Sequence, residues 1–170
     1  MRINTKLMAI GAFISYFVLD AITTCVAIRT YGAGAESNPA MSMAMGISGL
    51  AGFLTLKFII SLIVVLASYV LATRPGTMAT GISALIAITA GGLLTAANNT
   101  SALLTGTSLF YGLFGDASFI GPGTVIIAAM FAAGISAYAF ITLRSMHIGQ
   151  VKSSVDAVVH GMALITSFHH

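Results

Sequence analysis

Charged side chains are scarce in this sequence, and two of them, Asp20 and Lys57, fall inside long apolar runs. A charge at the centre of a bilayer costs about 2.5–3.5 kcal/mol on insertion scales, so such a residue usually has a partner and a function. Tyr16, Thr23 and Thr24 follow helical spacing relative to Asp20 and extend it into a polar stripe. The candidate chemistry is an ion pair that joins two helices or handles a proton or cation, and we favour the structural role.

Asp20 and Lys57 are expected at the same depth in consecutive antiparallel helices. Asp20 precedes the end of an expected first span, 7–28, by eight residues, and Lys57 follows the start of a second, 50–72, by seven. At about 1.5 Å per residue, each lies about 10–12 Å below the same membrane surface. We therefore predict an Asp20–Lys57 pair, supported by Thr23 and Thr24 and by Glu36 from the connecting segment.

The connecting segment contains two glycines, Glu36 and the dipeptide Asn38-Pro39. Proline disfavours helical geometry in the residue before it and is well placed in the first turn of a helix, so Asn38 or Ser37 is a candidate cap for a new helix. The predicted intramembrane polar site comprises Asp20, Thr23, Thr24, Glu36, Asn38 and Lys57.

Met41, Met43 and Met45 alternate just after this connection. Thioethers are soft ligands suited to Cu(I), and an extended backbone would point all three the same way, whereas a helix would spread them. No nucleophile–base constellation, phosphate loop or paired Cys and His zinc pattern is present, and Cys25 reads as a small buried hydrophobe. We expect no enzyme activity and no cofactor, with Cu(I) contact at the three methionines as a weaker alternative.

The composition indicates a membrane protein. Of 170 residues, 58% are hydrophobic and 6% are charged, whereas soluble domains carry about 25% charged residues. We predict an all-α fold, a four-helix transmembrane bundle over 1–146 with a C-terminal amphipathic helix over 147–170. The first apolar run is too long for a signal peptide and is expected to be a span. The expected spans are 7–28, 50–72, 77–97 and 124–143, with re-entrant or surface helices at 40–49 and 102–114.

Apolar residues of the tail alternate three and four positions apart: Ile148, Val151, Val155, Val158, Met162 and Ile165. This seam fits a helix lying on the membrane surface, or a helix that packs against a partner or another copy of the chain. Small residues in the fourth span (Ala128, Ala132, Ser136) and the third (Gly81, Ala84, Gly91) allow close helix approach and favour a packed bundle or docking face over a wide pore.

Positive charges predict the orientation. With four spans, five basic residues share one face, against Arg29 alone on the other: Arg2, Lys6, Arg74, Arg144 and Lys152. The positive-inside rule makes that face, and both termini, cytoplasmic in a multi-pass protein of the plasma membrane. Overlapping glycosylation triplets at Asn98 and Asn99 then fall in an outer loop. We interpret the excess of basic residues as a signal for orientation in the membrane, and we expect no nucleic-acid partner.

Asp20-x-x-Thr23-Thr24, followed by Glu36-x-Asn38-Pro39 and then Lys57, resembles a family of small polytopic membrane proteins of archaea and bacteria that is known as a domain of unknown function. The resemblance covers about the first third of the chain. It implies that these residues form one site, and it supplies no activity.

These patterns together predict a non-catalytic integral membrane subunit of a larger complex. A bioenergetic or oxidase-type assembly is the expected setting, and a copper-dependent membrane monooxygenase would suit the methionines. The expected partners are the lipid bilayer, other integral membrane subunits and further copies of the chain. The alternative is a small proton, cation or Cu(I) transporter or channel that uses Asp20, Lys57 and Glu36, and an intramembrane enzyme comes third.

Overall fold

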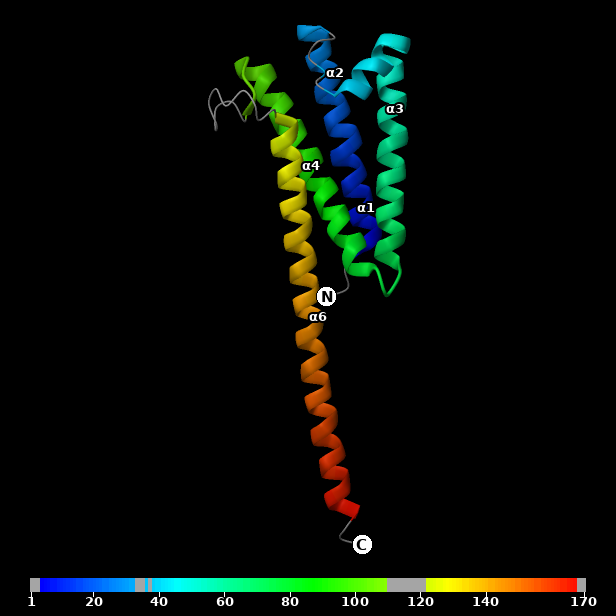
Figure 1. Cartoon of the computed structure of the whole chain (residues 1–170), viewed down its shortest axis with the longest axis vertical. Helices are drawn as coiled ribbons and strands as arrows, with labels where there is room; N and C mark the ends of the chain where they lie inside the picture. The colour runs from blue at the N-terminus through cyan, green and yellow to red at the C-terminus, as the bar shows by residue number, and fades with distance from the viewer. Residues whose placement is uncertain (1–3, 33–35, 37, 110–121, 168–170) are drawn as a thin grey trace.

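A computed structural model describes residues 4–32, 36, 38–109 and 122–167, and these residues form helices and no strand (Figure 1). The first span is one continuous rod made of α1 (Thr5–Phe13), the π-helical segment η1 (Ile14–Leu19) and α2 (Asp20–Tyr31). The Asn4 side chain caps the rod by accepting a hydrogen bond from Leu7 N at 3.2 Å. A π-helical turn is wider than an α-helical one, and this one ends directly before Asp20.

Helix α3 (Pro39–Thr73) contains a break that divides a short first part from the membrane-length second part. Asn38 caps its start, and its side-chain oxygen accepts from the amides of Ala40 and Met41. Ser48 and Gly49 leave helical geometry, and Gly49 has φ +61°. The expected division into 40–49 and 50–72 falls at the same place as this break.

Helix α4 (Met78–Thr105) continues eight residues beyond the expected end of the third span at 97. It ends where Gly106 adopts a left-handed conformation with φ +73°. Asn98 and Asn99 therefore lie on a helix and not in an outer loop. The expected surface helix at 102–114 is replaced by the end of α4 as far as Thr105, and its residues 110–114 lie outside the described part.

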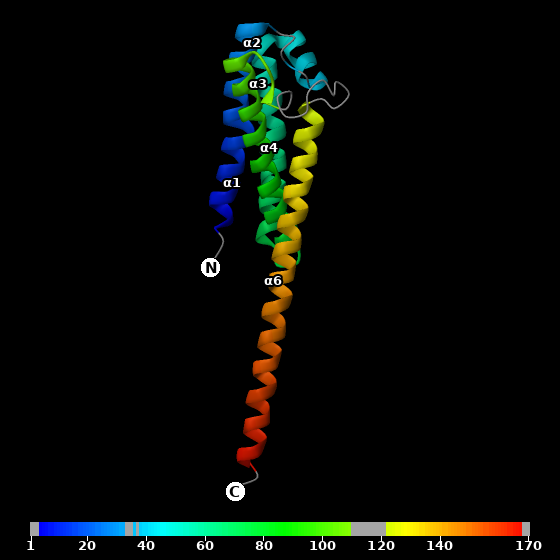
Figure 2. The same ribbon diagram turned by 90° about the vertical axis from the view of Figure 1, so that its left-hand side faces the viewer.

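Helix α6 (Pro122–Ser167) joins the expected fourth span and the expected tail helix into one element of 46 residues. No break separates 143 from 147, because Arg144, Ser145 and Met146 are all compatible with a helix interior. The predicted C-terminal helix is present. Of the two alternatives given for it, a helix that turns to lie along the membrane surface differs from the structure, in which the tail continues the line of the span (Figures 1 and 2).

Helix α4 lies at the centre of the arrangement and contacts every other described helix, whereas α4 is the one described helix against which α6 packs. Two glycines permit this packing: Gly91 of α4 faces the Met130 side chain, and Gly134 of α6 faces Ala87. The N-terminus and the turn between α3 and α4 lie at one end of the bundle, and α6 projects past that end (Figures 1 and 2).

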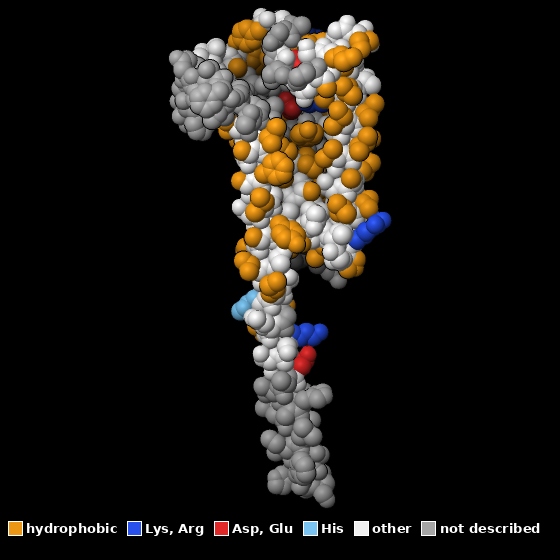
Figure 3. Space-filling view, viewed as in Figure 1, with side chains coloured by type: hydrophobic (Ala, Val, Ile, Leu, Met, Phe, Trp, Pro, Cys, Tyr) orange, Lys and Arg blue, Asp and Glu red, His pale blue; other side chains and the backbone are white. Residues whose placement is uncertain are grey.

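Within the described part of the chain, four helices are long and apolar enough to cross a membrane: Thr5–Tyr31, Ala40–Thr73, Met78–Thr105 and Val125–Asp156. Large apolar side chains cover much of the outer surface, as Figure 3 shows, and such a surface requires lipid as its solvent. The rings of Phe13, Phe17 and Phe58 join the first span to α3. The predicted all-α, four-span fold is confirmed, and the four helices indicate a multi-pass membrane protein.

Candidate functional site

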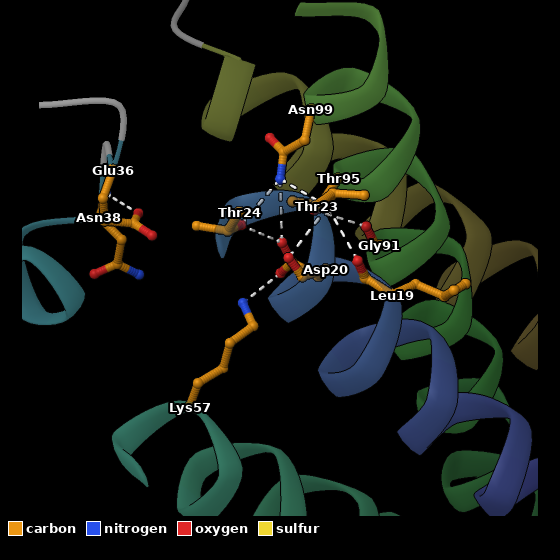
Figure 4. Close-up of polar contacts among 10 residues, drawn as sticks. All are labelled: Leu19, Asp20, Thr23, Thr24, Glu36, Asn38, Lys57, Gly91, Thr95 and Asn99. Carbon is orange, nitrogen blue, oxygen red and sulfur yellow. Dashed lines mark hydrogen bonds and ion pairs between the residues drawn. The ribbon is translucent and has the colours of Figure 1, made fainter. Parts of the chain in front are cut away.

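Asp20 and Lys57 form an ion pair between the first span and α3 (Figure 4). Lys57 Nζ lies 2.5 Å from Asp20 Oδ2, and the two side chains are 11% and 8% exposed. The ring of Phe53, one turn before Lys57 on α3, lies 5.6 Å from the ammonium nitrogen and adds a cation–π contact. Because both charges are nearly removed from solvent, removal of either one would leave the other uncompensated.

The other oxygen of Asp20 is also hydrogen-bonded. Thr24 Oγ1 donates to Oδ1 at 3.1 Å, and Asn99 Nδ2 approaches the same oxygen at 3.4 Å. The carboxylate therefore accepts from an ammonium, a hydroxyl and an amide. These donors come from three different spans, so satisfying this single carboxylate requires those three spans to be packed together.

Asn99 is a residue that sequence reasoning did not assign to the site. Its Nδ2 also lies 3.0 Å from Thr24 Oγ1 and 3.2 Å from Thr23 Oγ1, which makes it the hub on α4 (Figure 4). The interpretation of Asn98 and Asn99 as loop residues concealed this role. A usable signal was present in the sequence, because Thr95 and Asn99 are four residues apart and share one helical face.

Two other predicted site residues lie near the ion pair without contacting it. Glu36 Oε1 accepts a hydrogen bond from Asn38 N at 2.7 Å, and Asn38 serves as the cap of α3. Figure 4 shows both residues in the connecting segment, apart from Asp20 and Asn99. Thr23 Oγ1 mainly donates to backbone carbonyls of its own helix, at Leu19 and Asp20.

A cavity of about 290 Å³ opens beside the ion pair, and each of the four spans contributes to its wall. Charged side chains are visible in this recess near the upper end of the bundle in Figure 3. Its polar lining residues come from the first three spans and the α2–α3 connection, together with a few apolar ones, whereas the lining residues from α6 are all apolar. The lining residues include Tyr16, Asp20, Thr24, Glu36, Lys57, Ser61, Asn98, Asn99, Ile126 and Met130.

The side chains of the three alternating methionines do not point to a common site. Met41, Met43 and Met45 lie in the first, helical part of α3, where residues two apart point about 200° away from each other. Met41 is buried and lines the cavity, whereas Met43 is exposed. Among the described residues, no group of three or more His, Cys, Asp or Glu side chains is placed to hold a metal ion.

A bundle of apolar helices that encloses a hydrogen-bonded ion pair defines a polytopic helical membrane protein with an internal polar site. The chain belongs to the family described as Domain of unknown function (DUF5658), whose model matches residues 11–106. The match extends beyond the first third of the chain, includes Asp20, Lys57 and Asn99, and ends before α6. No curated protein and no solved structure matches the chain.

Proposed function

We propose that this protein is a non-catalytic integral membrane subunit that assembles with other membrane polypeptides through α6. The observation that carries the proposal is the length and isolation of this helix. Its 46 residues span about 69 Å at about 1.5 Å per residue, whereas the hydrocarbon core of a bilayer is about 30 Å thick. Among the described helices only α4 packs against it, and the C-terminal part of α6 extends beyond the other described helices (Figure 1).

Exposed apolar side chains continue along the C-terminal half of α6, where they have no partner among the described residues. Ile148, Val151 and Val155 lie in the C-terminal half of α6 and are 58%, 52% and 54% exposed. The C-terminal part of this helix projects past the ends of the other described helices (Figure 1). The candidate span Val125–Asp156 includes these residues, but its 32 residues extend about 48 Å at about 1.5 Å per residue, so a hydrocarbon core about 30 Å thick cannot cover all of its apolar side chains. Their spacing of three and four is that of a coiled-coil seam, which a second helix would cover.

A small-residue face on α6 supports the same proposal within the membrane. Ala128, Ala132 and Ser136 are four residues apart and exposed, because Met130 and Gly134 face α4 instead. Small residues at this spacing let another transmembrane helix approach closely. The partner is another integral subunit, in a bioenergetic or oxidase-type assembly, or a further copy of this chain.

Within such a subunit, the Asp20–Lys57 pair stabilises the helix packing. The pair draws the first span, α3 and α4 together, because its hydrogen-bonding partners come from all three. By the positive-inside rule, the end of the bundle with the N-terminus, the α3–α4 turn and the α6 extension is cytoplasmic. The ion pair then lies in the outer half of the plasma membrane.

Native mass spectrometry of the protein extracted from its own membrane in mild detergent tests this proposal. Co-migration with other polypeptides in fixed ratio, or a defined homo-oligomer, is the expected result. Replacing Val151 and Val155 with Glu should dissociate the assembly, whereas replacing Gln150 and Ser153 on the opposite face with Glu should not. A monomer in the unmodified protein would refute assembly.

The cavity favours a second candidate, a small proton or cation transporter that uses Asp20, Lys57 and Glu36. Asp20→Asn separates the two functions. A subunit would assemble poorly after the substitution, because the ammonium of Lys57 loses its counter-ion. A transporter would show proton or cation flux in reconstituted vesicles before the substitution, and the fraction of the variant that still folds would lose it, whereas a subunit would show no flux in either form.

A further inference from the structure

The cavity beside Asp20 contains a hydroxyl group that the described part of the protein leaves without a partner. Ser61, one turn after Lys57 on α3, is completely buried, and its Oγ makes no hydrogen bond. Other hydroxyls of the bundle, such as those of Ser68 and Thr95, donate to carbonyls of their own helix. A buried polar atom without a partner is unfavourable, so a molecule in the cavity that reaches Ser61 Oγ would remove this cost.

Two further donors line the same cavity. The ammonium group of Lys57 has three N–H donors, and Asp20 is its hydrogen-bonding partner, so it retains donors for another acceptor. Within the described residues the hydroxyl of Tyr16 makes no hydrogen bond. The inner part of the cavity therefore presents two hydroxyls and an ammonium that is paired with the Asp20 carboxylate but keeps spare N–H donors, which is a setting for a strongly accepting group.

The part of the cavity near the α2–α3 connection is acidic, in contrast to the donors of its inner part. Glu36, in the connection between α2 and α3, lines the cavity, and no described Lys or Arg lies within ion-pair distance of its carboxylate. Its contact with the backbone amide of Asn38 uses one oxygen. This part of the cavity therefore favours a positively charged group.

We propose that the cavity binds a small zwitterion, with its anionic group at Lys57, Ser61 and Tyr16 and its ammonium group at Glu36. Asp20, Lys57 and Glu36 carry a formal charge of −1 together, so a simple anion would add to the repulsion. A simple cation would leave the inner donors without an acceptor. A zwitterion would place its anionic group against the inner donors and its ammonium group against Glu36, and it would add no net charge to the site. Adding net charge is costly where little water is present to solvate it.

The size of the cavity limits the ligand. Its volume of about 290 Å³ is at the lower limit of the roughly 300–1,000 Å³ typical of small-molecule pockets. A free amino-acid-like solute and the head group of a zwitterionic lipid share the required chemistry. This site does not depend on assembly through α6, because it is formed within one chain.

Ligand-induced thermal stabilisation of the full-length protein, delipidated in detergent, tests the proposal. The probes are L-alanine and 4-aminobutanoate, each with its N-acetyl derivative as an anion and its amide as a cation. Phosphatidylethanolamine and phosphatidylglycerol of equal chain length form the lipid arm. Stabilisation by either zwitterion, or by phosphatidylethanolamine, above the singly charged counterparts is expected and identifies the source. Equal or greater stabilisation by an anionic or a cationic counterpart, or no response to any probe, would overturn the proposal.

Variants locate the binding site. Ser61→Ala and Glu36→Gln should each weaken binding of the responding zwitterion about tenfold, as expected for one lost hydrogen bond to a charged group. Ser68→Ala is the matched control, because Ser68 is buried on the same helix but outside the cavity lining. Binding that is unchanged in both Ser61→Ala and Glu36→Gln would place the ligand elsewhere and refute the assignment.

Discussion

Gly92 of α4 lies directly against the backbone of Ser15 in η1. A Cβ atom on Gly92 would come within 2.4 Å of the Ser15 carbonyl carbon and 2.5 Å of Tyr16 N, which real side chains do not tolerate. Two helical turns further along α4, Asn99 lies on the same face as Gly92. A similar rise along the first span leads from Ser15 to Thr23 and Thr24. The close contact at Gly92 therefore sets the register in which Asn99 reaches the Asp20 cluster.

Gly92→Ala should move α4 away from the first span and weaken the hydrogen bonds that Asn99 makes to Asp20, Thr23 and Thr24. Inserting a methyl group into a packed interior typically costs about 1–3 kcal/mol, and here the obstructing atoms are backbone atoms. Thermal unfolding in detergent, followed by circular dichroism, measures the loss of stability. Gly11→Ala is the control, because Gly11 is helical in the same bundle and its Cβ would meet nothing within 4 Å. Equal stability of the two variants would contradict the register argument.

Asn99→Ala should destabilise the bundle by about 1–3 kcal/mol, because it removes the amide that bridges Asp20, Thr23 and Thr24. Asn99→Asp should be more damaging, because it places a second carboxylate beside Asp20 in a site with one ammonium. Thr100→Ala is a suitable comparison, since Thr100 is exposed and donates within its own helix. If Asn99→Asp were as stable as the unmodified protein, the hub role of Asn99 would be wrong.

The ion pair should show strong coupling in a double-mutant cycle. Asp20→Asn or Lys57→Met alone leaves a nearly buried, uncompensated charge, a change that typically costs about 3–5 kcal/mol. The double variant removes both charges and should therefore lose much less than the sum of the two single variants. Equilibrium unfolding in mixed micelles gives the four free energies. Additive losses would mean that the two charges do not stabilise each other.

The sequence predicted the number and type of the elements well, because apolar length and scarce charges are strong signals in a membrane protein. Asp20 and Lys57 could be predicted to pair because their positions in consecutive antiparallel helices place them at the same depth below one membrane surface. The course of α6 was not predicted, because a heptad seam looks the same whether its helix continues a span or starts anew. The end of α4 was also misplaced, since two consecutive asparagines normally indicate a loop.

The parts of the site that escaped prediction depend on packing rather than on residue type. The π-helical turn before Asp20 has no clear sequence signature, yet it is the part of the first span that faces Gly92. Ser61 is an ordinary residue in an apolar run, and only the cavity beside it makes its hydroxyl distinctive. Periodicity identifies the faces of helices, whereas it does not reveal where the packing of those faces leaves a space.

The break in α3 provides a further test of how the cavity is closed. Gly49 has φ +61° and ψ −154°, a conformation that is essentially restricted to glycine and costs other residues about 1–3 kcal/mol. The break lets the segment from Pro39 to Ser48 turn away from the axis of α3, so that Met41 lines the cavity. Gly49→Ala should therefore straighten or loosen this segment.

Hydrogen exchange across residues 39–48 is the measurement for Gly49→Ala, and it should become faster there while exchange in 50–73 changes little. Gly46→Ala is the matched control, since Gly46 lies three residues earlier with ordinary helical geometry and an open Cβ direction. That substitution should leave exchange unchanged or slow it, because alanine has the higher helix propensity. Faster exchange in both variants would mean that the segment responds to any added methyl group, and that the glycine conformation at the break is not what positions Met41 beside the ion pair.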